Sequence, residues 1–237
     1  SASLFLSGSL IVNDVSTRSL EGVDVDSAID PFQMSFSSEE LPFLKTDHKL
    51  IASGVRSVTF LRFKVYGVGI YISAKDEPKL VRIIQEFLKE HPVTSLKSLL
   101  ADKQISQQVV DKISQQVPYA VRITPIRNTD FGHMKDGLTK SILANPMTQV
   151  HREEISKGVE QLRNVFQGFK GLVPKNKTMW VVSDTKSMTL YNTIKDIQKM
   201  GEIQEPLILR VLLVSYLSNL QPLSESLRQN FASYAST

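Results

Sequence analysis

The pattern of hydrophobic and polar positions predicts one strongly hydrophobic β region, followed by a long series of helices. Residues 55–72 are rich in Val, Ile, Phe and Tyr, the composition that favours strands. Gly67 and Gly69 are expected to mark a bulge or a bend between two strands there. Three cations share one parity in this stretch: Arg56, Arg62 and Lys64. We therefore expect them on one face, at a polar cavity or a solvated rim.

Apolar residues spaced by three and four positions predict helices over most of the remaining chain. The expected helices cover 77–91, 95–101, 104–117, 128–144, 149–169 and 206–219, and a last one begins at Ser224. Thr148 is expected to cap the helix over 149–169. Shorter β segments are expected at 3–12, 119–124, 178–183 and 187–191, the last two forming a hairpin.

This order of elements predicts an α+β fold, with an antiparallel sheet covered on one face by a layer of helices. Residues 1–237 are expected to form a single domain. Residues 13–53 are polar and irregular, and we expect a strand or two and a long loop there, with an inserted loop within 24–53. The regular βαβ alternation of a nucleotide-binding sheet is absent from the pattern.

Composition narrows the possible chemistry. The 237 residues include 28 Lys and Arg against 24 Asp and Glu, a formal net charge of +4, and no basic run with interleaved aromatics, so we expect no nucleic-acid binding. The absence of Cys excludes zinc ribbons, thiol nucleophiles and thiolate-bound haem. No apolar run approaches the ~18 residues of a membrane span. We expect a presequence and a membrane-associating segment to lie outside this sequence.

Two segments carry a resemblance to a known family. Gly54-Val55-Arg56, followed by Lys64 and Gly69-Ile70-Tyr71, resembles the G-x-R, K-F-T and G-V-Y-L pattern of the chalcone isomerases. The stretch RITPIRNTDFGHMKDGLTKSI resembles the strand-to-helix segment in which that family keeps catalytic residues. The predicted hairpin around Trp180 and the two helices after it also resemble the order of elements at the end of that family's domain. The chain is most similar to the fungal mitochondrial branch of the family, which implies the chalcone isomerase fold.

The resemblance implies an active site of which little is retained here. Arg56 matches the family Arg, which in the true isomerases stabilises the attacking phenolate, and Tyr66 falls at the supporting Thr. The family Lys falls near Pro125, and the family Tyr falls near Phe131 or His133.

The remaining family positions lie on the later helices. The family Asn falls near residues 138–141, and the late Ser or Thr falls at Ser215 or Tyr216. Losing several preorganised donors, at ~2.7–4 kcal/mol each, leaves little catalysis. We therefore expect no catalytic residues. The expected ligand-binding residues are Arg56, Lys64, Tyr66, Phe131, Ser215 and Tyr216.

The family resemblance implies binding functions instead. Its fungal mitochondrial branch is associated with haem, and other members bind fatty acids through the Arg. We expect a non-catalytic mitochondrial protein, associated with the inner membrane, that binds non-covalent b-type haem or another hydrophobic small molecule. His133 and His48 are the candidate haem ligands. The alternatives are a fatty-acid-binding protein and a residual chalcone isomerase, an intramolecular lyase.

Overall fold

The computed structural model describes residues 21–58, 63–93 and 95–234. Within them a seven-stranded antiparallel sheet has the strand order β11-β10-β9-β6-β5-β4-β3. Its strands are β3 (Ser35–Phe36), β4 (His48–Val58), β5 (Phe63–Ser73), β6 (Tyr119–Pro125), β9 (Met179–Ser183), β10 (Met188–Asn192) and β11 (Gln198–Ile203). Two short ribbons pair β1 (Gly22–Val23) with β2 (Phe32–Gln33), and β7 (Thr129–Asp130) with β8 (Leu172–Val173).

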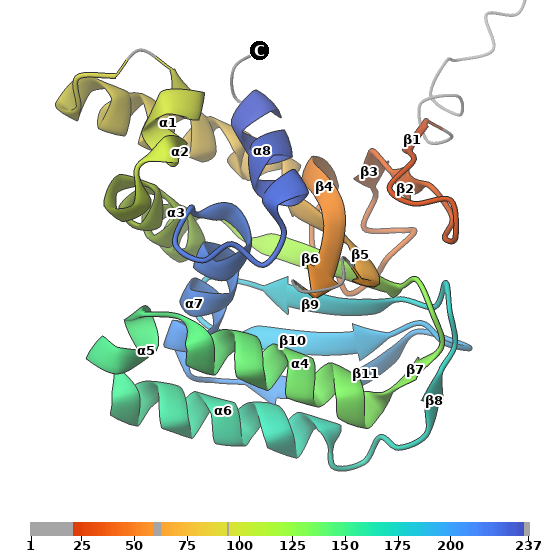
Figure 1. Cartoon of the computed structure of the whole chain (residues 1–237). Helices are drawn as coiled ribbons and strands as arrows, with labels where there is room; N and C mark the ends of the chain where they lie inside the picture. Colours follow the sequence, from red (N-terminus) through yellow and green to blue (C-terminus); the bar gives the residue numbers. More distant parts are fainter. Residues whose placement is uncertain (1–20, 59–62, 94, 235–237) are drawn as a thin grey trace, which may run out of the picture.

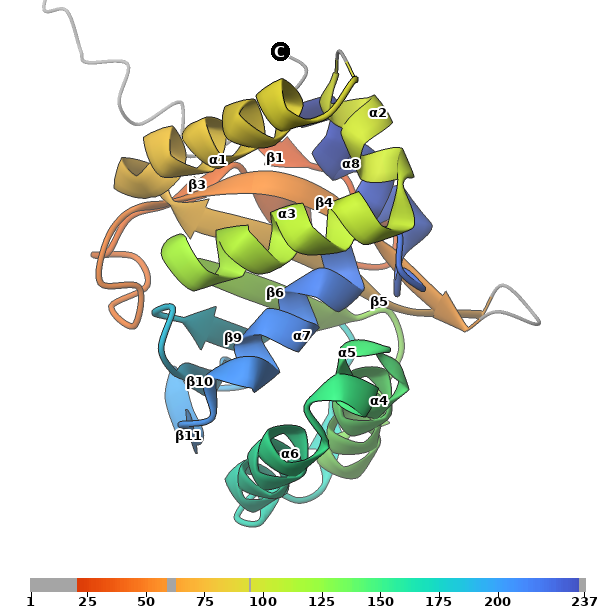
Figure 2. The same cartoon turned by 90° about the vertical axis from the view of Figure 1, so that its left-hand side faces the viewer.

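The helices lie on one side of this sheet, as Figure 2 shows from the helical side. They are α1 (Glu77–Glu90), α2 (Leu96–Ala101), α3 (Lys103–Gln116), α4 (Phe131–Ala144), α5 (Met147–Val150), α6 (Arg152–Phe166), α7 (Pro206–Leu217) and α8 (Glu225–Tyr234), with a 3₁₀ turn at Ala74–Asp76. The almost entirely apolar α7 is buried in the middle of the layer. The predicted α+β fold, with helices over one face of an antiparallel sheet, is confirmed.

Two hydrophobic cores lie on opposite faces of the sheet. The main core fills the space between the sheet and the helices, and Val68 and Ile70 of β5 face it. The second core contains Phe32, Tyr71 and Trp180, and it is covered by the chain before β4. Figure 1 shows β1 to β3 on the side of β4 and β5 away from the helices. The segment within 24–53 thus supplies cover for the second face. Whether it is an insertion relative to the family stays a prediction.

The hydrophobic region at 55–72 divides differently from the prediction. β4 extends from His48 to Val58 and β5 from Phe63 to Ser73, so Gly67 and Gly69 lie inside β5 rather than between two strands. A Cβ on Gly69 would come within 2.9 Å of the Phe32 ring, so the second core requires a residue without a side chain there. The predicted strand at 3–12 and the expected cation Arg62 fall outside the described residues.

The prediction of one helix over 149–169 was wrong at its start. Thr148 donates its hydroxyl to the Ile142 carbonyl (2.7 Å) and lies inside the short α5. The helical conformation is interrupted at His151 (φ −122°, ψ 47°), and α6 begins at Arg152. The other predicted helices appear where expected, including α4, whose cap Asp130 accepts from the His133 amide (2.8 Å).

Candidate functional site

The site begins with a row of side chains across three neighbouring strands. Arg56 on β4 is the direct cross-strand partner of Tyr66 on β5, and Tyr66 is in turn the partner of Pro125 on β6. Tyr66 packs against the main core, so this row lies on the helical side of the sheet. The position to which the resemblance assigns the family Lys is therefore next to Tyr66, and Pro125 offers no amine there.

Tyr216 of α7 completes the site from the helix layer. Its hydroxyl lies 2.7 Å from the hydroxyl of Tyr66, and its side chain is fully buried. The Arg56 guanidinium is close enough to act electrostatically on both phenols. Three of the residues expected to bind ligand, which lie on β4, β5 and α7, are thus brought together in space.

Arg56, Tyr66 and Tyr216 are all protonated, so together they form a cluster of hydrogen-bond donors. Burial raises the pKa of the Tyr66 phenol and that of the Tyr216 phenol, while the nearby Arg56 guanidinium opposes both shifts. Both phenols are therefore neutral at physiological pH. Because one of the two hydroxyl hydrogens is used in the bond between them, the other is free to donate. A cation beside a free hydroxyl donor complements a carboxylate or another oxyanion.

Arg56 itself is half-buried and lacks a counter-charge among the residues that the structure describes. Among the described residues no carboxylate lies within ion-pair distance of it, and none of their hydrogen bonds involves its side chain. A guanidinium at the edge of a core is normally paired, because desolvation of a lone charge is costly. The missing partner is what an acidic ligand would supply.

Helix α8 holds the strand segment just before Arg56. The Ser53 amide donates to Asn230 Oδ1 (2.8 Å), the Val55 amide donates to Ser226 Oγ (3.1 Å), and the Val55 carbonyl accepts from the Ser224 hydroxyl (2.7 Å). These bonds satisfy backbone groups on the outer edge of β4, where no strand of the described part of the chain pairs with residues 53–55. They fix the backbone that carries Arg56.

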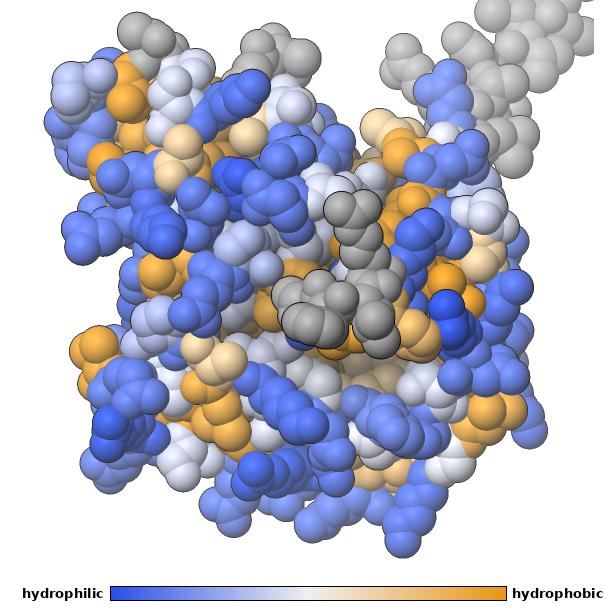
Figure 3. All heavy atoms as spheres, in the orientation of Figure 1, coloured by the Kyte–Doolittle hydropathy of each residue, from blue (hydrophilic) through white to orange (hydrophobic). Residues whose placement is uncertain are grey.

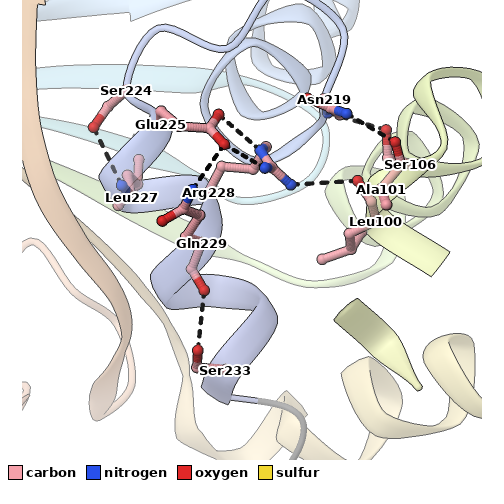
Figure 4. A network of polar contacts seen from close by, with 10 residues as sticks. All are labelled: Leu100, Ala101, Ser106, Asn219, Ser224, Glu225, Leu227, Arg228, Gln229 and Ser233. Atoms are coloured by element: carbon pink, nitrogen blue, oxygen red, sulfur yellow. Dashed lines mark hydrogen bonds and ion pairs between the residues drawn. The ribbon is translucent and has the colours of Figure 1, made fainter. Parts of the chain in front are cut away.

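Figure 4 shows how α8 is itself held against the helix layer. Arg228 pairs with Glu225 and donates to the Leu100 carbonyl at the end of α2 (3.5 Å). Asn219, which precedes α8, donates its side-chain amide to the Ala101 carbonyl (2.8 Å). The position of Arg56 therefore depends on contacts that extend from β4 through α8 to α2.

Lys64 is on the other side of the sheet from Arg56, contrary to the expectation of one shared face. A bulge separates the pair Arg56 and Tyr66 from the pair Ser57 and Lys64, so β5 carries one extra residue, Val65. One extra residue in a strand moves the side chains beyond it to the opposite face of the sheet. The Lys64 ammonium instead binds Asp26 (2.9 Å) of the chain that covers the second core, and this pairing lowers the Asp26 pKa.

Ser215 and Phe131 have structural partners of their own. Ser215 accepts from the Asn145 amide (2.9 Å) and donates to the Val211 carbonyl (2.8 Å), which joins the end of α4 to α7. Phe131, at the first position of α4, packs against Phe169 with ring centroids 5.6 Å apart. The Asn145–Ser215 bond was not foreseen, because the two residues are 70 positions apart.

The two candidate haem ligands lie in different surroundings. His133 occupies the first turn of α4 with 78% of its side chain exposed, and its Nδ1 lies 2.5 Å from Asp130 Oδ2. His48 is buried at the opposite end of β4 from Arg56, in the wall of a cavity on the second-core side. The structure does not bring His48 and Arg56 together.

Neither a metal-binding cluster nor a membrane-spanning helix is found among the described residues. No group of three His, Asp or Glu side chains in them is arranged to hold a metal ion. None of the helices built from them has the length and apolar character needed to cross a bilayer. Figure 3 shows, on the face drawn, small groups of apolar side chains separated by polar ones.

Residues 46–232 match the family model described as "Chalcone isomerase like". The chain is 44% identical over 216 residues to "Altered inheritance of mitochondria protein 18, mitochondrial" of Debaryomyces hansenii, covering 88% of this chain and 73% of that protein. It is 37% identical to the protein of the same name from Lachancea thermotolerans, covering 96% of this chain and 79% of the relative.

A solved structure shows the same fold at low sequence identity. The crystal structure of a fatty-acid binding protein from Arabidopsis thaliana superimposes with a TM-score of 0.64 at 16% identity, and the match covers 91% of this chain and 98% of that one. It shares the curled antiparallel sheet with its layer of helices.

Proposed function

This chain belongs to the chalcone isomerase-like family, and from that membership and the geometry around Arg56 we propose that it binds an apolar molecule bearing a carboxylate without converting it. The observation that carries the proposal is the half-buried Arg56 guanidinium, unpaired among the described residues, beside the neutral phenols of Tyr66 and Tyr216. The guanidinium supplies charge to one oxygen of the carboxylate, and a phenol donates to the other.

The same geometry argues against isomerase chemistry. Both tyrosines are held protonated by burial, so neither is poised to accept a proton. Pro125 occupies the position next to Tyr66 at which the resemblance places a Lys. The cluster therefore binds and orients an anion but lacks the second cation that the cyclisation uses.

Haem is our first candidate for the ligand, because it combines an apolar ring with two propionates that Arg56 could bind. Haem iron also needs an axial donor, and in a chain without Cys this is His, Tyr, Met or Lys. The phenols of Tyr66 and Tyr216 lie beside Arg56, and an axial bond from either oxygen would require loss of the proton that burial holds there, whereas His48 faces the opposite side of the sheet. Bound haem would bring a redox-active iron to this site.

A fatty acid is the second candidate. It needs an anchoring cation and an apolar environment but no axial donor, and Arg56 at the border of the main core meets both needs. The likeness to a solved protein named as fatty-acid binding favours this ligand.

Three titrations of the purified protein distinguish these functions. Haemin should give a shifted Soret band on binding, palmitate should compete for the same site, and chalcone should remain unconverted. Haemin binding without competition by palmitate would contradict a shared carboxylate site. Formation of a chiral flavanone from chalcone would contradict the non-catalytic assignment and support the residual isomerase.

We propose that the protein performs this function in mitochondria, at the inner membrane. Its relatives are named mitochondrial, which supports the first part. Fractionation of the organelle tests the second, since recovery of the protein only with matrix contents would contradict it.

A further inference from the structure

Arg127 is a second guanidinium on the same face of the sheet as Arg56. Ile126, the residue before it, belongs to the second core, and its amide donates to the Val65 carbonyl of β5 (3.1 Å). The extended pairing of the two strands therefore continues to this point, where successive side chains alternate between the two faces. Arg127 consequently lies on the helical side of the sheet, the side of Arg56 and Tyr66.

The contact between Arg127 and Phe63 agrees with this placement. Val58 and Phe63 are direct cross-strand partners at the ends of β4 and β5, and Val58 lies two residues beyond Arg56 on β4. Because residues two apart on a strand share a face, Val58 and Phe63 lie on the face of Arg56. The Arg127 guanidinium is 3.9 Å from the centroid of the Phe63 ring. Both Val58 and Phe63 are exposed, so they present apolar surface beside the two cations.

The charge of Arg127 is not neutralised within the described part of the chain. There, no carboxylate lies within ion-pair distance of it, and no hydrogen bond involves its side chain. The Phe63 ring attracts the guanidinium through its electron-rich face but brings no counter-charge. Arg127 is thus a second cation that is positioned by the fold and left without an acidic partner.

Arg127 is placed at the rim of the site rather than in it. It is exposed, whereas Arg56 is half-buried. Neighbouring strands are ~4.8 Å apart and each residue advances ~3.4 Å, so two strands and two residues separate the Cα atoms of the two arginines by roughly 12 Å. Arg127 therefore does not replace the amine that the resemblance places at Pro125, directly beside Tyr66.

The two cations differ in what they have left to bind. In the function proposed above, Arg56 and a phenol complement the two oxygens of one carboxylate, which leaves Arg127 for another group. Resting on that function, we propose that the ligand carries two acidic groups, and that Arg127 binds the second one at the rim. The site then favours an apolar diacid over an apolar monoacid. Haem with its two propionates is of the first class, and a fatty acid is of the second.

Haemin and its monomethyl ester are the probes that test this contact, because they share the ring and the iron and differ by one free acid. We expect the intact chain to bind haemin about fivefold more tightly than the ester at low ionic strength, the upper range for an exposed charge pair. In Arg127→Gln, whose side-chain stem still covers Phe63, the affinity for haemin should fall to that for the ester, and the affinity for the ester should not change.

A matched control removes the same charge elsewhere. Arg163 is an exposed arginine in the last turn of α6, and Arg163→Gln should keep the fivefold preference for haemin. Equal weakening of haemin and ester binding in Arg127→Gln would overturn the proposal, because it would show that Arg127 acts through its packing on Phe63. Unchanged haemin binding in that variant would overturn it as well.

Arg56→Ala separates failure of this contact from failure of the proposed function. If Arg56→Ala weakens haemin binding and Arg127→Gln does not, the second acidic contact is wrong and the anchor at Arg56 stands. If Arg56→Ala leaves haemin binding unchanged, the site itself is wrong, and the contact at Arg127 is wrong with it.

Discussion

The hydroxyls of Tyr66 and Tyr216 are hydrogen-bonded to each other beside Arg56, and the contribution of this bond to stability can be measured. Tyr66→Phe leaves the fully buried Tyr216 hydroxyl without its partner, which should lower the free energy of unfolding by about 1–3 kcal/mol. The double variant with Tyr216→Phe should lose less than the sum of the two single variants, because no hydroxyl is then orphaned. Urea unfolding measures all three, and strict additivity would show that the two hydroxyls do not interact.

His48 makes the stability depend on pH in a defined direction. Burial lowers its folded-state pKa below the ordinary 6.5, so the unfolded chain binds the proton more readily. Its contribution to stability is complete above pH 6.5 and is lost as the pH falls through the folded-state pKa. Between about pH 7 and pH 5 the wild type should therefore lose more stability than His48→Leu. Parallel curves for the two proteins would contradict the buried neutral imidazole.

At the scale of single residues, the family resemblance predicted part of the site. Arg56, Tyr66 and Tyr216 were expected to bind ligand, and the structure brings them together. Lys64 was misplaced because the bulge at Val65 depends on pairing with the neighbouring strands, which parity along one strand does not reveal.

Among the elements, the docking of α8 on β4 is the contact on which the site depends most. A Cβ on Gly54 would come within 2.5 Å of the Leu227 backbone nitrogen, so Gly54→Ala should cost about 1–3 kcal/mol of stability and weaken haemin binding two residues away at Arg56. Gly137→Ala is the matched control, because a Cβ there meets nothing within 4 Å and the exposed helix should gain about 0.5–1 kcal/mol. Equal effects of the two changes on unfolding and haemin binding would contradict this role of α8.

Elements with strong periodicity and a capping residue were predictable, as α4 with Asp130 and α8 with Ser224 show. β11 was missed because it is a mostly polar edge strand in which only Met200 and Ile203 are buried. The pairs Leu190–Gly201 and Tyr191–Lys199 leave Met200 as an extra residue in β11, and this bulge further obscures any alternation. The break at His151 was missed because apolar spacing continues through it, and tertiary packing decides where α5 ends.

For the molecule as a whole, the sheet is covered on both faces, and the chain before β4 provides the second cover. Phe32 is fully buried there, and its ring lies under the Arg122 guanidinium at 4.0 Å. Phe32→Ala should therefore cost about 3–5 kcal/mol in urea unfolding, as for a core aromatic residue. A loss below about 1 kcal/mol would show that this segment is a dispensable loop rather than part of the fold.

The central claim is that Arg56 anchors the acidic group of an apolar ligand, and the haemin affinity of Arg56→Ala tests it most directly. Removing a charged hydrogen-bonding partner, worth about 1.5–3 kcal/mol, should weaken binding about 10- to 150-fold. Arg152→Ala, which removes an exposed arginine at the start of α6, should leave the dissociation constant unchanged. If Arg56→Ala binds haemin as tightly as Arg152→Ala does, Arg56 is not the anchor and the proposed site is wrong.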